Sequence, residues 1–166
     1  SLLNGSAVIV CGFNKTRIGL NAKIRDHNEF TEHTPMIGDR VICLKNNKRS
    51  NVPLYNGAHG TIRHITKNSH LDFARSVIEM DGVNEDMFRG KMLYGAFAKE
   101  KFNSYETGPG KEVFDYGYAI TAHKSQGSEF EKVMVIEEGK YVWRENWNKW
   151  LYTAVTRSSD ELLIVG

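Results

Sequence analysis

The chain has 166 residues, of which 40% are hydrophobic and 25% are charged, and its formal net charge is +2. This length and composition are those of an ordinary globular protein with one main core, and they exclude a chain that is disordered throughout. The charge is too small to indicate a partner by itself, because nucleic-acid binding depends on where the Lys and Arg residues cluster.

The first predicted element is a buried strand. Residues 7–13, AVIVCGF, form a continuous apolar run that is typical of a parallel strand covered on both faces. Ile18, Leu20 and Ile24 then recur with partial helical periodicity, so we expect a helix after the strand. A buried-type strand so close to Ser1 predicts that the sequence is cut from a longer protein.

The character of the sequence changes after Pro35. The stretches MIGDRVICLKNN, GAHGTIRHI and ARSVIEMDG read as three short strands separated by turns, and they predict a small antiparallel barrel over residues 38–85. Seven Lys or Arg residues but only two Asp residues lie between positions 38 and 75. This basic lobe fits a nucleic-acid backbone, although a solvated face has the same pattern. Residues 86–112 lack a sustained period and predict a partly extended return connection.

The last third of the chain alternates strands and helices again. Two short apolar runs, YAI and residues 133–136, predict buried strands, and RENWNKWLYTAVTR and ELLIVG predict a helix and a final strand. The sequence therefore predicts an α/β layer interrupted by a β insert. Trp143, Trp147 and Trp150 recur at about one helical turn, which favours core packing over an exposed patch for a protein partner.

A polar cluster separates these two strands, in ITAHKSQGSEF. Thr121 can cap a short helix whose free amides attract phosphate, and His123 and Lys124 add donors there. Gly127 allows a close turn, and the carboxylate of Glu129 can accept hydrogen bonds from sugar hydroxyls. A capped surface turn with solvated charges explains the same residues equally well.

Two further groups of polar residues follow other elements. Arg157 comes at the end of the predicted last helix, where it can stabilise charge in phosphoryl transfer or simply counter the helix dipole. Asn14, Lys15 and Arg17 follow the first strand, at a position that suits a polar ligand. Capping by Asn14 beside exposed cations is the alternative for this second group.

Cys11 and Cys43 each lie within an apolar run, so we expect small core residues of a reducing compartment and neither a disulfide nor a zinc site. No run reaches the roughly 18 apolar residues that span a bilayer. The N-terminus also lacks the pattern of a signal peptide. We therefore expect a cytoplasmic protein without membrane contact.

Taken in order, three of these stretches resemble conserved motifs of the superfamily 1 helicases, in the RecD-like branch of bacteria and phages. VCGFNKTRIGLNAKIR resembles motif IV, YAITAHKSQGSEFEKVMVI resembles motif V, and LYTAVTRSSDELLIV resembles motif VI. The stretch GDRVICLKNN to YNGAHGTI is similar to the inserted Src-homology-3-type barrel of that branch. The resemblance covers nearly the whole chain.

The resemblance implies a RecA-like second motor domain of the P-loop NTPase type, formed by residues 1–37 and 111–166 and interrupted by an inserted barrel and return connection at 38–110. It implies an ATP-dependent DNA helicase in repair or recombination that moves on single-stranded DNA, with a suggested 5′ to 3′ polarity. ATP and Mg²⁺ would be bound mainly by the first motor domain of the same polypeptide, so this chain alone should not hydrolyse ATP. Exonuclease subunits are possible partners.

The resemblance also implies roles for individual residues, with no metal ligand among them. The DNA contacts implied are Thr121, His123 and Lys124. The nucleotide contacts implied are Gly127, Glu129, Arg17 and Lys15. Arg157 would be the arginine finger. A non-catalytic nucleic-acid-binding module, in which the basic insert binds and the α/β part is a scaffold, is the main alternative function.

Overall fold

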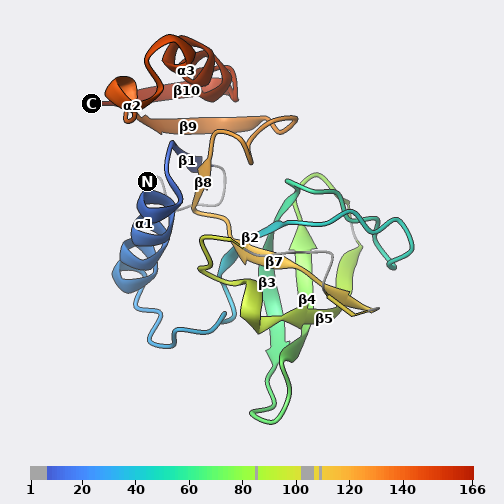
Figure 1. Cartoon of the computed structure of the whole chain (residues 1–166). Coiled ribbons are helices and arrows are strands. Elements are labelled where there is room, and N and C mark those ends of the chain that lie inside the picture. Colours follow the sequence, from blue (N-terminus) through green and yellow to red (C-terminus); the bar gives the residue numbers. More distant parts are fainter. Residues whose placement is uncertain (1–6, 85, 102–106, 109) are drawn as a thin grey trace. The chain divides into compact units, whose positions relative to one another are not determined.

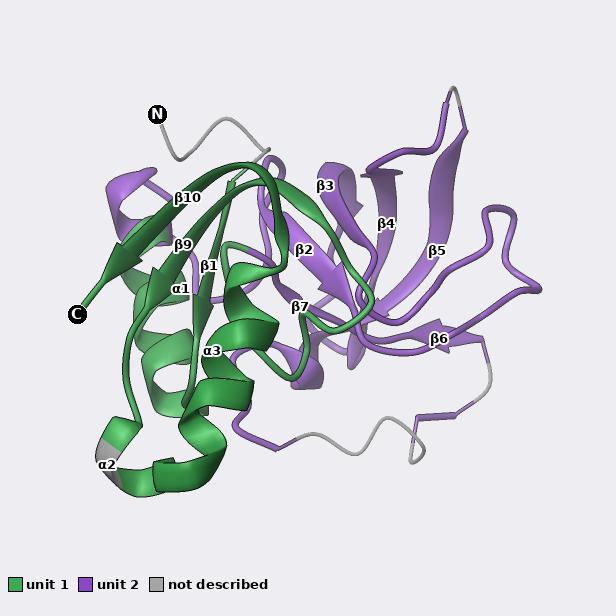
Figure 2. Cartoon of the chain, turned by 90° about the horizontal axis from the view of Figure 1, so that it is seen from above, with its two compact units in different colours: residues 1–24, 118–166 green, residues 25–117 purple. Residues whose placement is uncertain are grey.

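The computed structural model describes residues 7–84, 86–101, 107–108 and 110–166. The chain forms two compact units, which Figure 2 colours separately. Unit 1 consists of residues 1–24 and 118–166, and unit 2 consists of residues 25–117. Unit 2 therefore interrupts the chain of unit 1. The predicted return connection lies partly outside the described residues, at positions 102–106 and 109.

Unit 1 contains a parallel sheet with the strand order β10-β9-β1-β8 (Figure 1). The strands are β1 (Ala7–Cys11), β8 (Ala119–Thr121), β9 (Phe130–Ile136) and β10 (Ser158–Val165). The helices are α1 (Asn14–His27), α2 (Lys140–Trp143) and α3 (Trp147–Val155), with a 3₁₀ turn η3 (Arg144–Asn146) before α3. The predicted α/β fold class is confirmed. Across the described residues no helix has both the length and the apolar character needed to cross a membrane.

Helices α1 and α3 cover opposite faces of this sheet (Figure 1). The chain leaves β1 toward β8 on one side and leaves β9 toward β10 on the other. Because crossovers between parallel strands are right-handed, connections in opposite directions place their helices on opposite faces. The central strands are thus covered on both sides, and they bury Val8, Val10, Val133 and Val135.

The side chain of Asn21 joins α1 to the edge strand β8. Its Nδ2 donates to the carbonyl of Ala119 at 2.9 Å, and its Oδ1 accepts from the amide of Ala119 at 2.9 Å. Asn21 is 2% exposed. Because β8 pairs with β1 alone among the described strands, this amide supplies hydrogen bonds that a further strand would otherwise make.

Aromatic side chains pack between the loops of unit 1. The rings of Trp143 and Phe13 lie 4.9 Å apart between centroids, and those of Trp143 and Trp150 lie 5.2 Å apart. A Cβ atom at Gly12 would come within 2.1 Å of the Trp143 ring, so a larger residue at this position would have to displace that ring. Trp143 and Trp150 therefore pack against other rings as expected, but both are half-buried and neither is part of the buried core.

Unit 2 contains a sheet with the strand order β6-β5-β4-β3-β2-β7. Its strands are β2 (Arg40–Cys43), β3 (His59–Thr66), β4 (Phe73–Met80), β5 (Met87–Leu93), β6 (Lys111–Glu112) and β7 (Phe114–Tyr116), and a 3₁₀ turn η1 (Tyr94–Ala96) follows β5. Neighbouring strands are antiparallel except β5 and β6. The three predicted strands of the insert are confirmed as β2, β3 and β4. Closure into a barrel stays a prediction, because β6 and β7 end the strand order.

The expected return connection at residues 86–112 was wrong in one respect, since it contains the full strand β5. Arg89 and Lys91 are exposed on β5, whereas Phe88 and Met92 are buried. Gly90 interrupts this alternation in the sequence, but a Cβ atom there would come within 2.4 Å of the Phe88 ring. The Phe88 ring thus occupies the space that a side chain at position 90 would fill. Hydrogen-bonded pairing with β4 continues along the whole of β5, through Gly90.

A buried ion pair anchors the segment that enters unit 2. Arg25 donates to the carboxylate of Asp39 through Nε at 2.9 Å and through Nη2 at 3.1 Å. The amide of Met36 donates to the same carboxylate at 2.8 Å, and the guanidinium lies 4.4 Å from the ring centroid of Tyr116. The shared carboxylate therefore fixes the turn that precedes β2.

Both cysteines are free and buried, as the sequence predicts for core residues. Burial raises the pKa of the Cys11 thiol to about 12, with a further contribution from the Glu138 carboxylate. Burial likewise raises the pKa of the Cys43 thiol to about 11. Both thiols are therefore protonated at neutral pH, and neither is a nucleophile in the folded chain.

Candidate functional site

The predicted short helix after β8 is wrong, because residues 122–127 form hydrogen-bonded turns. The carbonyl of Thr121 accepts from the amide of Ser125 at 3.0 Å, and its hydroxyl accepts from the amide of Lys124 at 3.4 Å. Ser125 is fully buried and donates its hydroxyl to the carbonyl of Ala122 at 2.7 Å. Such local bonds offer the backbone an alternative to a continuing helix. Thr121 nevertheless caps the turn as predicted.

The side chains of His123 and Lys124 are exposed on this turn. Within the described residues neither side chain has a hydrogen-bond or ion-pair partner. Thr121 itself is only 9% exposed. The turn therefore presents two accessible donors of hydrogen bonds around a buried cap.

Gly127 ends the turn with φ = 83°, a left-handed conformation that favours glycine. No atom lies within 4 Å of a Cβ atom built there, so backbone conformation and not space requires the glycine. Glu129 follows with an exposed carboxylate, which has no hydrogen-bond or ion-pair partner in the described part of the chain.

Arg157 contacts this same connection from the end of α3. Its Nη1 donates to the carbonyl of Ser128 at 3.2 Å, and its Nε donates to the carbonyl of Thr153 on the last turn of α3 at 3.0 Å. Its own carbonyl accepts from the amide of Phe130 at 2.8 Å. The Arg157 side chain thus binds to the carboxyl end of α3, which is one of the two roles predicted from the sequence. It also lies against the segment between Gly127 and Glu129.

The two ends of the connection lie at opposite edges of the parallel sheet. Thr121 is level with Cys11 at the carboxyl ends of β8 and β1, whereas Phe130 is level with Ser158 at the amino ends of β9 and β10. The 7 residues of β9 span roughly 20 Å at about 3.3 Å per residue. Residues 122–129 therefore run from one edge of the sheet to the other.

The cations of the first turn of α1 lie at the carboxyl edge, with Thr121. Arg17 is 7% exposed, and its Nε donates to Oδ1 of Asn14 at 3.1 Å. Lys15 is exposed. The structure therefore brings Arg157 together with the Gly127–Glu129 segment, but it does not place Arg17 or Lys15 beside them.

Glu138 is a residue of this edge that the sequence analysis missed. Its Oε1 accepts from the amides of Gly12 at 2.6 Å and Phe13 at 2.9 Å, and its Oε2 accepts from the hydroxyl of Thr16 at 2.8 Å. The carboxylate thus satisfies donors that precede and open α1. Its position in the sequence could have identified it. Glu138 comes shortly after the end of β9, and Gly12 comes directly after the end of β1, so the two residues lie at the same edge of the parallel sheet.

Comparison with known proteins supports the predicted class. Residues 116–165 match the sequence profile of the UvrD-like helicase C-terminal domain. An uncharacterized protein of Methanocaldococcus jannaschii is 30% identical over 132 residues, which are 78% of this chain and 10% of that protein. The chain therefore spans about a tenth of the length of this curated relative.

Solved structures of Pif1 helicases have the same fold. The Bacteroides enzyme in complex with ADP-AlF3 and ssDNA is 17% identical, with a TM-score of 0.61 over 98% of this chain and 41% of that one. The Candida albicans enzyme is 12% identical, with a TM-score of 0.55 over 98% of this chain and 46% of that one. The profile match and these folds together support a superfamily 1 helicase C-terminal domain. This chain covers less than half of either solved chain.

Proposed function

We propose that the chain is the second motor part of an ATP-dependent DNA helicase of the RecD-like branch, which couples ATP hydrolysis to movement on single-stranded DNA. The observation that carries the proposal is the hydrogen bond from Arg157 to the carbonyl of Ser128. It joins motif VI to the part of motif V that contains Gly127 and Glu129, the residues assigned to the nucleotide. The proposed motor is formed by residues 1–37 and 111–166, with residues 38–110 as the insert.

In this proposal the nucleotide contacts lie at the amino edge of the sheet. The half-buried guanidinium of Arg157 and the exposed carboxylate of Glu129 fit the phosphate and sugar groups of a nucleotide in charge and in hydrogen-bonding type. ATP, held with Mg²⁺ mainly by a first motor domain, would supply the phosphoryl group. Arg157 would neutralise charge on that group, so this chain alone is not expected to hydrolyse ATP.

The DNA contacts would lie at the other end of the same connection. Thr121, His123 and Lys124 present hydroxyl, imidazole and ammonium donors that fit backbone phosphates of a single strand. Because residues 122–129 join the two sheet edges, a shift of Arg157 and Glu129 on nucleotide binding can reach the DNA turn through the connection itself. Lys15 and Arg17 are at the DNA edge, and their assigned phosphate contact requires a rearrangement there.

The test is the Arg157→Ala substitution in the complete polypeptide. We expect the DNA-stimulated ATPase rate to fall by about 10³-fold or more, the usual effect of an arginine finger, while ATP binding weakens far less. Arg157→Lys should rescue little, because an ammonium lacks the planar fork of donors. Lys149→Ala, on the exposed face of α3, is the matched control and should leave the rate unchanged.

An ATPase rate within a few-fold of the original would overturn the finger assignment and leave Arg157 as a helix-end residue. Thermal unfolding of each variant separates this outcome from misfolding, because Arg157 also bonds to Thr153 and Ser128. Retained DNA binding without any ATPase activity in the original polypeptide would instead favour the non-catalytic binding module. The exposed cations of unit 2 favour that second candidate.

A further inference from the structure

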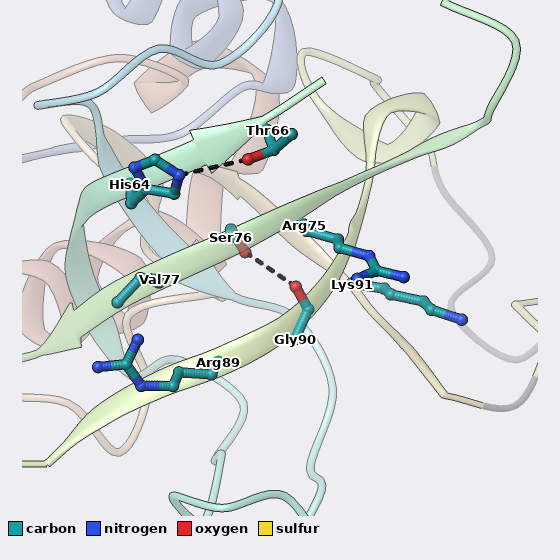
Figure 3. Close-up of a pocket in the computed structure, with 8 residues that line it drawn as sticks. All are labelled: His64, Thr66, Arg75, Ser76, Val77, Arg89, Gly90 and Lys91. Carbon is teal, nitrogen blue, oxygen red and sulfur yellow. Dashed lines mark hydrogen bonds between the residues drawn. The ribbon is translucent and has the colours of Figure 1, made fainter. Parts of the chain in front are cut away.

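Unit 2 has a hollow of about 360 Å³ on the face of three neighbouring strands (Figure 3). Most of its side chains are cationic or polar, and six of them define what we name the β3–β5 basic face: His64, Thr66, Arg75, Val77, Arg89 and Lys91. No Asp or Glu is among the described residues that line the hollow. It is therefore a positively charged surface on strands β3, β4 and β5.

Strand register places these residues in two rows across the sheet. Arg75 on β4 is directly opposite Lys91 on β5, and Val77 is directly opposite Arg89. The side chains of Arg75 and Lys91 run side by side in Figure 3. Directly opposite residues have Cβ atoms about 4.5–5.5 Å apart, and like charges in this arrangement are destabilising. An anion bound between Arg75 and Lys91 would remove that repulsion.

Other cations of the same sheet form ion pairs with carboxylates, whereas the described residues offer no such partner to the cations of the β3–β5 basic face. Arg40 pairs with Asp81, Arg63 pairs with Glu79, and Lys111 pairs with Asp72 at 2.8 Å. Among the described residues no carboxylate pairs with a cation of the β3–β5 basic face. The ammonium of Lys91 lies 5.0 Å from the ring centroid of Phe73, a contact that leaves its charge intact.

The described residues of the hollow offer no aromatic ring on which a base could stack. None of the described residues that line it is Phe, Tyr or Trp, and single-stranded nucleic acid is usually held by stacking on such rings. Arg and Lys on a sheet surface instead suit phosphates, which need no stacking and carry no sequence information. The hollow therefore matches a backbone whose bases are already stacked and paired.

We propose that the β3–β5 basic face binds the sugar–phosphate backbone of duplex nucleic acid. Arg75 and Lys91 contact one phosphate group and Arg89 contacts another. This surface belongs to unit 2, whereas the Thr121 turn, to which the proposed function assigns the single strand, belongs to unit 1. The choice of nucleic acid over an acidic peptide rests on that proposed function, but the binding itself requires neither ATP nor the motor.

The test compares two triple variants with the same charge change. Arg75→Gln, Arg89→Gln and Lys91→Gln together remove the cations of the hollow. Lys48→Gln, Arg49→Gln and Lys101→Gln remove three exposed cations of unit 2 outside it. Fluorescence anisotropy without nucleotide measures affinity for a blunt duplex, a single-stranded oligonucleotide and a polyglutamate peptide over a salt series.

We expect the hollow variant to bind the duplex at least about tenfold more weakly at low salt. The slope of log affinity against log salt should become shallower by about 0.9 for each phosphate that the variant no longer neutralises. The control variant and the single-strand affinity should change little, and Arg75→Lys alone should keep most of the duplex affinity. Unchanged melting temperatures would show that both variants are folded.

Equal losses in both triple variants would overturn the proposal in favour of a general charge effect. A larger loss for the single strand than for the duplex would assign the hollow to the DNA track instead. Polyglutamate binding that depends on the hollow, with duplex binding unchanged, would indicate an acidic protein partner. None of these outcomes bears on the ATPase effect of Arg157→Ala, so failure of one proposal is distinguishable from failure of the other.

Discussion

At the scale of single residues, His59 on β3 is a buried imidazole. It is 5% exposed, and its Nδ1 lies 3.0 Å from the carbonyl of Gly57. Burial is the main reason why its pKa is lowered to about 4. The nearby Arg40 cation also lowers the pKa, and this effect is larger than the opposite effect of the Asp81 carboxylate. His59 is therefore neutral in the folded chain at all pH values near neutrality.

This lowered pKa predicts a loss of stability in mild acid. The unfolded chain binds a proton at His59 below about pH 6.5, whereas the folded chain does so only near pH 4, so protons favour unfolding between these values. We expect the free energy of unfolding to fall by about 2 kcal/mol from pH 7 to pH 5. Urea unfolding at a series of pH values measures it.

The His59→Gln variant tests the assignment. It should lose part of its stability at pH 7, because the buried ring is replaced, but it should show a flatter dependence on pH than the original chain. His64→Gln, at an exposed position on the same strand, should keep the original dependence. An unchanged pH dependence in His59→Gln would show that another group binds the proton. The carboxylates of Glu32 and Asp72 have lowered pKa values and act only at lower pH.

Side chains that bond across long stretches of sequence were not predictable. Glu138 is 126 residues from Gly12, and Asn21 is 98 residues from Ala119. Their chemistry, a carboxylate or amide near strand ends, is common in any sequence. Their partners depend on strand order and register, which apolar periodicity does not specify. Thr121, Gly127 and Arg157 could be singled out because they occur in dense local motifs.

At the scale of elements, Glu138 links the start of α1 to the end of β9. Its carboxylate accepts three hydrogen bonds from the loop between β1 and α1 and from the first turn of that helix. Hydrogen bonds to charged groups contribute about 1.5–3 kcal/mol, and an unsatisfied buried donor adds its desolvation cost. This contact therefore contributes substantially to the position of α1 on the sheet.

We expect Glu138→Ala to lower the free energy of unfolding by about 2–3 kcal/mol. Glu138→Gln keeps a carbonyl acceptor and should cost less than half as much. The matched control is Glu137→Ala, one residue earlier in the same loop. Chemical denaturation of the three variants measures these differences. Equal costs for Glu137→Ala and Glu138→Ala would mean that the cap contributes nothing specific.

Elements made of contiguous apolar runs were predictable, and those completed by partners were not. β1 and residues 133–136 of β9 are continuous apolar runs that are half-buried or buried throughout, so the sequence alone indicates strands there. β5 alternates basic and apolar residues around Gly90, and only its register with β4 makes it a strand. The turn after Thr121 was misread as a helix because capping residues are the same in both structures.

At the scale of the whole molecule, each compact unit has its own core and one buried cysteine. Cys11 lies in unit 1 and Cys43 lies in unit 2, and both are completely buried. Of the twelve largest fully buried side chains of the described residues, eight belong to unit 2, with Phe88 and Phe114 the largest, and four belong to unit 1: Ile120, Val8, Val10 and Val135. Unit 2 therefore has the larger contribution from apolar burial.

Unit 1 has a weaker outer strand. Leu162, Leu163, Ile164 and Val165 of β10 are 41–53% exposed, although they alternate between the two faces of the sheet. Within the described residues β10 pairs with β9 alone. Apolar residues that stay exposed contribute little to stability, so the free energy of opening should be lower for unit 1 than for unit 2.

The two cysteines make this difference measurable in the unmodified chain. Thiol reagents attack the thiolate, and burial raises both pKa values so far that labelling requires opening of the unit that contains the cysteine. We expect Cys11 to be labelled at lower urea concentrations than Cys43, with the two transitions resolved by mass spectrometry of separate peptides. A Cys43→Ala variant should reproduce the Cys11 transition, because the substitution lies in the other unit. Coincident transitions at Cys11 and Cys43 would contradict the expectation, since they would require both units to unfold as one cooperative structure.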